Sequence, residues 1–492
     1  MQQNRTTQPQ KNRATTPCKN RYPVVVARLC LVCAVMLLSA CSSFSVHDQP
    51  LKQWSPEQES QIQAQIEGDR SKELAVLLAF SGGGTRAAAF SFGVLKELAD
   101  TQIVTANGKR SLLQEVDIIS SVSGGSFTAA YYGLYGDKIF TDFEPQFLHK
   151  NVEGILLRKV FLNPFNWVRL MSSTFGRSEL AAEYYDEELF KKATIADMKR
   201  ADAPLVVMNA SDLGTGDRIS FMQTDFNVLC LDLDSYPISR AVAASSAVPV
   251  ILSPVTLENF AGSCDFQPAG WLAEALKDDE LTQRKIEARE LSYYLDKTKR
   301  PWLHLVDGGV ADNVGLRAYY EGLSMADEPG THTKFLHNEN MRHVIIIVVN
   351  AHARRKSDWL LERYAPGIFE VIESVTADQV ARYSLDTIQL VRQTFNSWAK
   401  KNSTPEHPLT FHFVEISFDY VQEDSEREFL NNVGTNFDIS VEQSDRLIAA
   451  ARQVLRESKE FKSFLELLRG EVTGTDSGLP VAEKGKRVSV PQ

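Results

Sequence analysis

The chain has 492 residues, 43% of them hydrophobic, and a formal net charge of −10. This length and apolar content are sufficient for the core of a large α/β domain. The acidic balance excludes a typical nucleic-acid-binding protein, which would carry a surplus of basic residues.

The first 40 residues predict a signal peptide. They contain six basic residues and no acidic one, and an apolar run at 29–38 precedes the small residues Ser39 and Ala40. This order is typical of secretory signals, and the run is too short to span a bilayer comfortably. Residues 38–41 resemble the lipobox of bacterial lipoproteins, which implies diacylation of Cys41 as the mature N-terminus. Ordinary signal cleavage and an uncleaved anchor are the alternatives.

Removal of this leader would leave 47 basic against 63 acidic residues. Ser42, rather than an aspartate, follows Cys41. By analogy with enteric lipoproteins, this favours the bacterial outer membrane over the inner membrane, with the side of the membrane left open. The polar stretch 41–70 predicts a tether. An α/β domain is expected at 71–470, followed by a disordered tail at 471–492.

From residue 74 onward, strands and helices alternate. The continuous apolar run at 74–80 predicts a strand buried on both faces, and helices are expected at 86–98, 126–134 and 441–457. Further strands are expected at 116–119, 204–210, 218–222, 302–306, 343–349 and 409–416. The alternation predicts a largely parallel sheet with helices on both faces, a three-layer α/β/α fold. Two insertions are expected near 153–188 and 258–300.

A glycine loop follows the first strand. Gly82, Gly83 and Gly84 lie between this strand and the next helix. Three successive glycines let backbone N–H groups approach one point closely, which suits an oxyanion hole. The loop lacks the pattern of a phosphate-binding loop. Arg86 would either brace this loop, bind an anionic head group or form a structural ion pair.

Ser123 is the candidate nucleophile. It stands at the centre of a G-x-S-x-G-like elbow, in which Ser121 replaces the first glycine and Gly125 is the second. Such an elbow holds the serine on a strained turn between a strand and a helix. The N–H of Gly124, the next residue, would join the oxyanion hole.

Asp307 is the candidate base. It follows an apolar strand and precedes Gly308 and Gly309. A partly desolvated carboxylate there could accept the serine proton, whereas a simple turn aspartate is the alternative. His304 lies three residues earlier in a strand, so it should face the opposite side of the sheet.

Together these segments resemble the patatin-like phospholipase family. That family has a G-G-G-x-R-G loop, a G-x-S-x-G elbow and a D-G-[GA] aspartate, and the likeness covers about residues 73–320. The resemblance implies a Ser123–Asp307 dyad without a catalytic histidine, with Arg86, Gly125, Gly308 and Gly309 supporting the motifs. Residues 244–249 resemble the small-residue segment that packs near the site in this family. Ser121 and Ala87 depart conservatively from the pattern.

The favoured function is a lipid acyl hydrolase of phospholipase A or lysophospholipase type, which forms an acyl-enzyme and acts on membrane lipid. One alternative is a Ser-His-Asp esterase or thioesterase that uses His352. The other is a non-catalytic lipoprotein that binds lipid or a partner on the same scaffold. Peptidase chemistry would use the same groups. No cofactor, metal or nucleic acid is expected, and no protein partner is predicted.

Two further features leave alternatives open. Cys230 and Cys264, the only cysteines beyond Cys41, could form a disulfide or remain buried thiols. Phe161, Phe165 and Trp167 lie among basic residues. They would either dip into lipid head groups or, as is more usual for aromatic residues, pack on the core.

Overall fold

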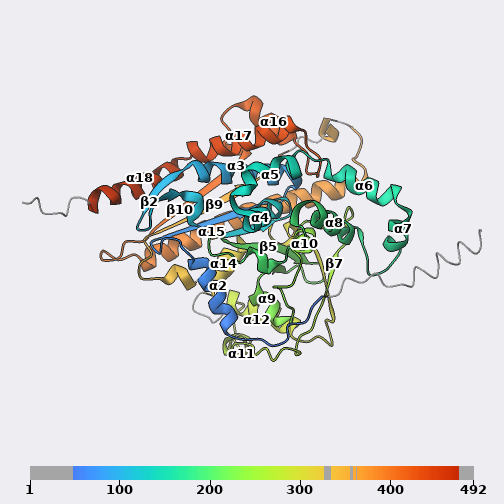
Figure 1. Cartoon of the computed structure of the whole chain (residues 1–492), viewed down its shortest axis with the longest axis horizontal. Coiled ribbons are helices and arrows are strands. Elements are labelled where there is room, and N and C mark those ends of the chain that lie inside the picture. The colour runs from blue at the N-terminus through green and yellow to red at the C-terminus, as the bar shows by residue number, and fades with distance from the viewer. Residues whose placement is uncertain (1–47, 326–333, 355–357, 362, 476–492) are drawn as a thin grey trace, which may run out of the picture.

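The computed structural model describes residues 48–325, 334–354, 358–361 and 363–475. A central sheet has the strand order β10-β9-β1-β4-β5-β8-β7, with β6 paired to β5. Helices cover both faces of this sheet (Figure 1), which confirms the predicted three-layer α/β/α fold. Its strands are β1 (Leu74–Phe80), β4 (Val116–Val122), β5 (Leu205–Asp212), β6 (Arg218–Ser220), β7 (Val255–Glu258), β8 (Trp302–Asp307), β9 (His343–Asn350) and β10 (Thr410–Ser417).

The central strand β1 shows how the two cores are divided. All seven of its residues are buried, because β4 and β9 pair with it on either side and helices cover both faces. Leu74, Val76, Leu78 and Phe80 face one core, and the alternate residues Ala75, Leu77 and Ala79 face the other. The predicted strand and the observed one have the same bounds.

Helices α3 (Gly84–Asp100), α4 (Gly124–Tyr135), α10 (Ile238–Ser245) and α17 (Val441–Glu457) pack on the larger core. Helices α2 (Glu57–Glu67), α14 (Arg317–Ser324) and α15 (Ile368–Asn402) pack on the other. The predicted helix at 441–457 is confirmed, with Ser440 and Gln443 forming its capping box. The other helices are α5 (Ile139–Phe143), α6 (Val152–Leu162), α7 (Pro164–Leu170), α8 (Arg177–Tyr185), α9 (Gln223–Val228), α11 (Gly270–Ala275), α12 (Gln283–Tyr294), α13 (Gly309–Asp312), α16 (Asp424–Asn432) and α18 (Lys459–Thr475).

All seven predicted strands are present, but the sheet is less parallel than the alternation suggested at one edge. Strands β10, β9, β1, β4 and β5 run parallel to one another. Strand β8 is antiparallel to both β5 and β7. Strand β7 and the small hairpin of β2 (Gln102–Thr105) and β3 (Gly108–Ser111) were not predicted.

Residues 48–70 differ from the expected tether because they pack against the domain. The Asp48 carboxylate forms an ion pair with buried Arg240 and accepts a bond from the Glu258 N–H at 2.8 Å. In α2, Ile62 and Ile66 are buried in the core on which this helix packs. Two isoleucines four residues apart form one apolar helix face, and burying that face holds the segment in place. The leader and Cys41 lie outside the described residues.

Cys230 and Cys264 form a disulfide, with their Cα atoms 5.5 Å apart. The structure thus decides between the two alternatives left open by the sequence. The N-terminal segment lies over this bond, because the N–H groups of Leu51 and Trp54 donate to the carbonyl oxygens of Cys230 and Cys264, each at 2.8 Å. Helix α18 continues through the start of the expected tail as far as Thr475. Among the described residues, none of the helices combines the length and apolar character needed to cross a bilayer.

Candidate active site

Ser123 sits on a strained turn between β4 and α4. Its φ of 50° and ψ of −119° are unusual for a residue with a side chain, and the residue is only 3% exposed. Such strain persists only where the surroundings enforce it. Here the Ser123 N–H donates to the Ser245 hydroxyl at 2.9 Å, and that hydroxyl donates to the Asn209 carbonyl at 2.6 Å. The turn therefore has the geometry of a nucleophile elbow.

Ser121 fits where a glycine was expected. Its hydroxyl donates to the Val207 carbonyl at 3.2 Å and accepts a bond from the Ser126 hydroxyl at 3.1 Å. Ser126 also lies 2.9 Å from the Ser245 hydroxyl. The extra side chain thus joins a buried network of serines beneath the elbow.

The glycine loop packs backbone to backbone against this elbow. A Cβ at Gly124 would collide with the carbonyl oxygen of Gly84, and a Cβ at Gly84 would collide with that of Asn436. Gly83 and Gly84 also have φ values of 139° and 59°, which favour glycine. Side chains at these positions would separate the loop from Ser123.

The structure corrects the predicted set of oxyanion donors. The Gly82 N–H donates to the Asn313 carbonyl at 2.9 Å, so it is not available to a ligand. Within the described residues, no acceptor is bonded to the N–H groups of Gly83, Gly84 or Gly124. Gly84 and Gly124 begin helices α3 and α4, so the positive ends of two helix dipoles add to these N–H groups. This point can hold negative charge.

Asp307 reaches the level of Ser123 by an unexpected route. In the sheet register, Val122 is opposite Asn209 and Asp307 is opposite Ala210, so Ser123 and Asp307 lie at one level on either side of β5. Because β8 is antiparallel, it starts beyond the carboxyl edge of the parallel strands and runs back toward it. The carboxylate thus arrives at the same edge as the elbow.

The Asp307 carboxylate is buried and touches Ser123. Burial raises its pKa from 3.8 to about 6, while hydrogen bonds from the Gly309 N–H, at 2.8 Å, and the Ser123 hydroxyl act to lower it. A group with this pKa is ionised at neutral pH but still basic enough to take up a proton. Gly308 packs against the Asn209 carbonyl, where a Cβ would collide. This arrangement can activate a serine.

Arg86 braces the loop. Its side chain is 4% exposed and donates to the Val433 carbonyl at 2.7 Å, which ties α3 to the segment before α17. This contact supports the interpretation that Arg86 braces the loop. Gly125 allows α4 to start against β1, since its Cβ would lie 2.7 Å from that of Phe80.

Two supporting residues were missed or only loosely placed by sequence analysis. Ser245 had been placed near the site only by the likeness of its segment, with no role assigned. Sequence analysis did not single out Asn313. A Cβ added at Gly82 would lie 2.5 Å from the Asn313 Oδ1 atom, and a Cβ added at Gly309 would lie 2.8 Å from the same atom. It therefore fills the space between the glycine loop and the aspartate loop. Its nearness in sequence to Asp307 is the only signal that could have drawn attention to it.

Among the described residues, neither His304 nor His352 is hydrogen-bonded to Ser123 or Asp307. His304 is exposed and its Nδ1 lies 3.0 Å from the Thr256 hydroxyl, as expected for the opposite side of the sheet. His352 follows β9 beside Arg86. Burial lowers its pKa, followed by the charges of Arg86 and Arg354, whereas Asp419 and Asp378 act to raise it.

Residues 78–319 match the family model of the patatin-like phospholipases. The matched segment includes both Ser123 and Asp307. No curated protein sequence matches the chain. Among solved structures, human GIVD cytosolic phospholipase A2 is similar at 14% identity and a TM-score of 0.42, over 88% of this chain and 69% of that one. Its complex with methyl gamma-linolenyl fluorophosphonate inhibitor and terbium chloride gives 13% identity and a TM-score of 0.39, over 87% and 67%.

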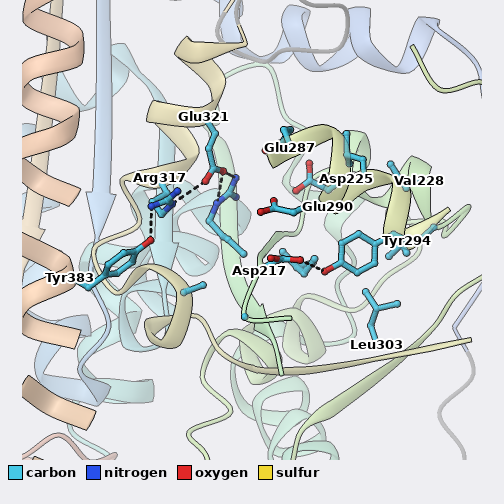
Figure 2. Close-up of a pocket in the computed structure, with 16 residues that line it drawn as sticks. Asp217, Asp225, Val228, Glu287, Glu290, Tyr294, Leu303, Arg317, Glu321 and Tyr383 are labelled. Atoms are coloured by element: carbon cyan, nitrogen blue, oxygen red, sulfur yellow. Dashed lines mark hydrogen bonds and ion pairs between the residues drawn. The ribbon is translucent and has the colours of Figure 1, made fainter. Parts of the chain in front are cut away.

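An acidic cavity of about 190 Å³ lies behind the aspartate loop, with Ala311 in its wall. Figure 2 shows Glu321 bonded to Arg317, while Glu287 and Glu290 face the cavity from α12. Burial, followed by neighbouring carboxylates, raises the pKa values of both, that of Glu290 to about 7. These two carboxyl groups therefore hold protons more tightly than ordinary glutamates.

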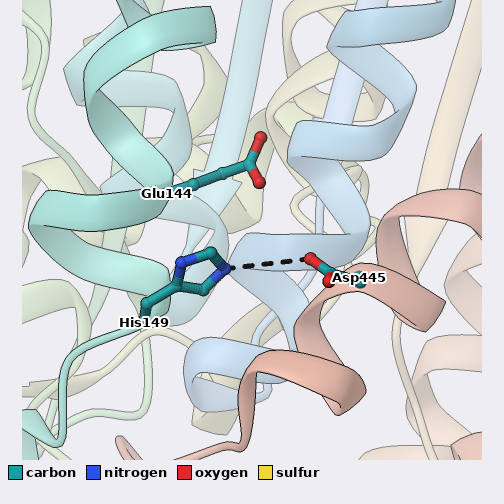
Figure 3. A group of neighbouring side chains, drawn as sticks. All are labelled: Glu144, His149 and Asp445. Carbon is teal, nitrogen blue, oxygen red and sulfur yellow. Dashed lines mark ion pairs between the residues drawn. The ribbon is translucent and has the colours of Figure 1, made fainter.

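One group of side chains in the described part of the chain has spacing suited to a metal ion: Glu144, His149 and Asp445 (Figure 3). The His149 Nε2 atom lies 3.8 Å from Asp445. However, the Lys96 ammonium lies 2.9 Å from Glu144 and already supplies a positive charge there. Asp445 is exposed, so the group has the character of a surface charge cluster.

Proposed function

We propose that this protein is a serine hydrolase that cleaves carboxylic esters of membrane phospholipids or lysophospholipids through a Ser123–Asp307 dyad. One observation carries the proposal: a serine on a strained elbow stands beside a buried carboxylate whose pKa is raised to about 6, and the serine hydroxyl acts to lower that pKa. A serine hydroxyl is a weak nucleophile until a neighbouring base removes its proton. The family match supports lipid as the substrate class.

In the first step, the Ser123 oxygen attacks the ester carbonyl while its proton passes to Asp307. The carbonyl oxygen becomes an oxyanion, which the N–H groups of Gly83, Gly84 and Gly124 face. The tetrahedral intermediate then collapses, and protonated Asp307 gives its proton to the departing alcohol oxygen. The acyl group remains on Ser123 as an ester.

In the second step, Asp307 takes a proton from a water molecule, which attacks the acyl-enzyme carbonyl. The same N–H groups stabilise the second oxyanion. Its collapse releases the fatty acid, and the proton returns from Asp307 to the Ser123 oxygen. Loss of one oxyanion donor typically costs ~10²–10³ in rate, so these glycines carry much of the catalysis.

The surroundings of Asp307 support a dyad over a triad with His352. Burial raises the pKa of Asp307, and the hydrogen-bonding groups that act to lower it are the Gly309 N–H and the Ser123 hydroxyl. Burial, followed by the charges of Arg86 and Arg354, lowers the pKa of His352, which disfavours the protonated imidazole that a triad histidine must form. We therefore expect the His352→Ala variant to retain activity.

We further propose that diacylated Cys41 anchors the protein to a bacterial outer membrane. The leader pattern and the lipobox-like residues 38–41 support this location. If so, fractionation of cells expressing the parent and a Cys41→Ser variant should find the parent in the outer-membrane fraction and the variant outside it. Equal membrane retention of both would contradict the anchor.

The decisive test measures fatty-acid release from phospholipid and lysophospholipid micelles by the purified full chain. Ser123→Ala and Asp307→Asn should each abolish release while circular dichroism and thermal unfolding stay close to those of the parent. His352→Ala serves as the matched histidine control. Release that survives Ser123→Ala, or that disappears in His352→Ala, would overturn the dyad. No release from any ester would favour a lipid-binding protein on a hydrolase scaffold.

A further inference from the structure

Helices α6 and α7 form a hairpin that exposes a cluster of large apolar side chains. Phe161 is 66% exposed, Leu162 75%, Phe165 60% and Trp167 51%. Leu157 and Met171 are also exposed. The expectation that the aromatic residues pack on the core is therefore wrong. Soluble proteins rarely gather so many large apolar groups on one surface element unless something binds there.

This hairpin is a built element with two distinct sides. Val152 is buried, and Ile155 and Leu156 pack against the core. The two helices are joined by hydrogen bonds from the Trp167 Nε1 to the Val160 carbonyl, at 2.6 Å, and from Asn166 to the Lys159 carbonyl, at 2.9 Å. The exposed side chains thus stand on a braced scaffold and face away from the core.

At its N-terminal end the hairpin starts beside the glycine loop. The N–H groups of Val152 and Glu153 donate to the Phe437 carbonyl, and the carbonyl of the preceding residue, Asn436, lies against Gly84. The exposed side chains of α6 are therefore connected to one wall of the candidate active site by a few residues.

The helix that follows the hairpin, α8, meets the segment after Ser245. Arg177 donates to the Val250 carbonyl, and the Ser178 N–H donates to the Ser253 hydroxyl. Val250 and Ile251 are themselves 75% and 63% exposed, so they add to the apolar surface on this side. Figure 1 shows α6 and α7 extending from the body of the molecule beside α8.

The charges on the hairpin are mostly neutralised. Lys159 pairs with Glu187 at 2.7 Å, and Arg169 pairs with Glu183. The chain as a whole is acidic. A partner that binds here must accept apolar and aromatic side chains without needing a strong positive patch. The interfacial region of a lipid bilayer takes Trp and Phe side chains in this way.

The chain also emerges on this side of the domain. Arg240 binds Asp48, the first described residue, and also binds Glu179 of α8, which directly follows the hairpin. Cys41 precedes Asp48 by seven positions. An acyl anchor at Cys41 would therefore hold the domain with this side close to the membrane.

We infer that the α6–α7 hairpin, with Val250 and Ile251, is the surface that docks the domain onto a lipid bilayer. This inference rests on the proposed function and deepens it, because docking here would bring lipid to the elbow at Ser123. Insertion of apolar side chains supplies the binding, so we expect attachment to zwitterionic vesicles with little dependence on salt.

The test uses the full chain with Cys41→Ser, so that no acyl anchor contributes to binding. Sedimentation with phosphatidylcholine vesicles compares this parent with Phe161→Ser/Leu162→Ser and with a matched control, Val104→Ser/Leu281→Ser. The control also removes two exposed apolar side chains, which lie outside the hairpin. We expect the hairpin variant to lose at least tenfold in vesicle affinity and in vesicle hydrolysis. Its rate on a water-soluble short-chain ester should stay within about twofold of the parent.

Several outcomes would overturn the inference. One is unchanged vesicle binding by the hairpin variant, or equal losses in the control. Another is a parent that is dimeric by size-exclusion chromatography and becomes monomeric only in the hairpin variant, with vesicle binding intact; the hairpin would then bind a second copy. A parent that binds vesicles through the hairpin but cleaves no ester would refute the proposed function and leave the docking surface standing.

Discussion

Replacement of Ser245 by alanine should both destabilise the fold and slow the reaction. Ser245 is fully buried and links the nucleophile elbow to β5. Its hydroxyl accepts a bond from the Ser123 N–H at 2.9 Å and donates to the Asn209 carbonyl at 2.6 Å. Alanine removes both bonds, so the buried Ser123 N–H loses this acceptor and the buried Asn209 carbonyl loses this donor.

The expected loss follows from these two groups. A buried donor or acceptor left unsatisfied costs about 1–3 kcal/mol. For the pair we expect a loss of about 2–4 kcal/mol in the free energy of unfolding. The φ of 50° at Ser123 is held in place partly by this bond. If the variant loses about 1.4 kcal/mol of transition-state stabilisation because the elbow is less well positioned, the rate of hydrolysis falls about tenfold.

The neighbouring residue provides the control. Ser246 is equally buried, but its hydroxyl donates to the Val242 carbonyl, which already accepts the Ser246 N–H. Ser246→Ala should therefore cost only about 0.5–1.5 kcal/mol. Urea unfolding gives both stabilities, and ester hydrolysis gives kcat and KM. Equal losses in the two variants, or an unchanged kcat in Ser245→Ala, would refute the idea that Ser245 positions the elbow.

Two predictions concern pH. Because the pKa of Asp307 is raised to about 6, the rate of hydrolysis of a neutral ester should fall about tenfold per pH unit below pH 6 and become constant above it. A rate that does not change from pH 5 to 8 would contradict the role of Asp307 as the base. For Glu287, burial and the nearby Glu321 and Glu290 raise the pKa in the folded state. The unfolded chain therefore loses this proton first as pH rises above about 4.5, and stability declines until the folded-state pKa is passed. Glu287→Gln should thus raise the unfolding temperature by an amount that grows between pH 5 and pH 8, whereas Glu280→Gln, at an exposed position, should not. An effect of Glu287→Gln that does not depend on pH would rule out this explanation.

The central strands were predictable because each is a continuous apolar run bounded by polar or glycine residues. Strand β1 consists of seven successive apolar residues, so apolar side chains lie on both of its faces. Such a strand is stable only where both faces are covered, which is why its burial could be predicted. Strand β7 was missed because Val255–Glu258 is only four residues long and half of it is partly exposed. Nothing in the residues of β8 indicates its antiparallel direction, since strand direction depends on which neighbour the chain reaches.

The elements of the candidate site were recognised from local patterns, but their final contacts were not. Whether a glycine N–H is available to a ligand depends on backbone angles, and these turn the Gly82 N–H toward the Asn313 carbonyl while leaving the N–H groups of Gly83 and Gly84 without a bonded acceptor among the described residues. The contact between the glycine loop and the elbow joins segments that are 40 residues apart in the chain. The spacing of these two segments in the sequence does not indicate that they come into contact in the fold.

Two expectations about segments failed for a common reason. Composition suggested that residues 41–70 form a tether and that the aromatic residues near 161–167 pack inward. The structure buries the Ile62–Ile66 face of the first segment and exposes Phe161 and Trp167 of the second. Burial depends on what lies opposite a helix face, which neither composition nor periodicity within the segment reveals.

The docked N-terminal segment has a consequence for how the enzyme would encounter its substrate. The described structure is held in place at Asp48, which lies seven positions after Cys41. A chain of that length reaches at most about 25 Å. With the proposed acyl groups at Cys41, the enzyme would sample lipids only in its own patch of leaflet. Its turnover would then depend on the fraction of substrate lipid in that leaflet, and dilution of the suspension with buffer would leave the rate per enzyme unchanged.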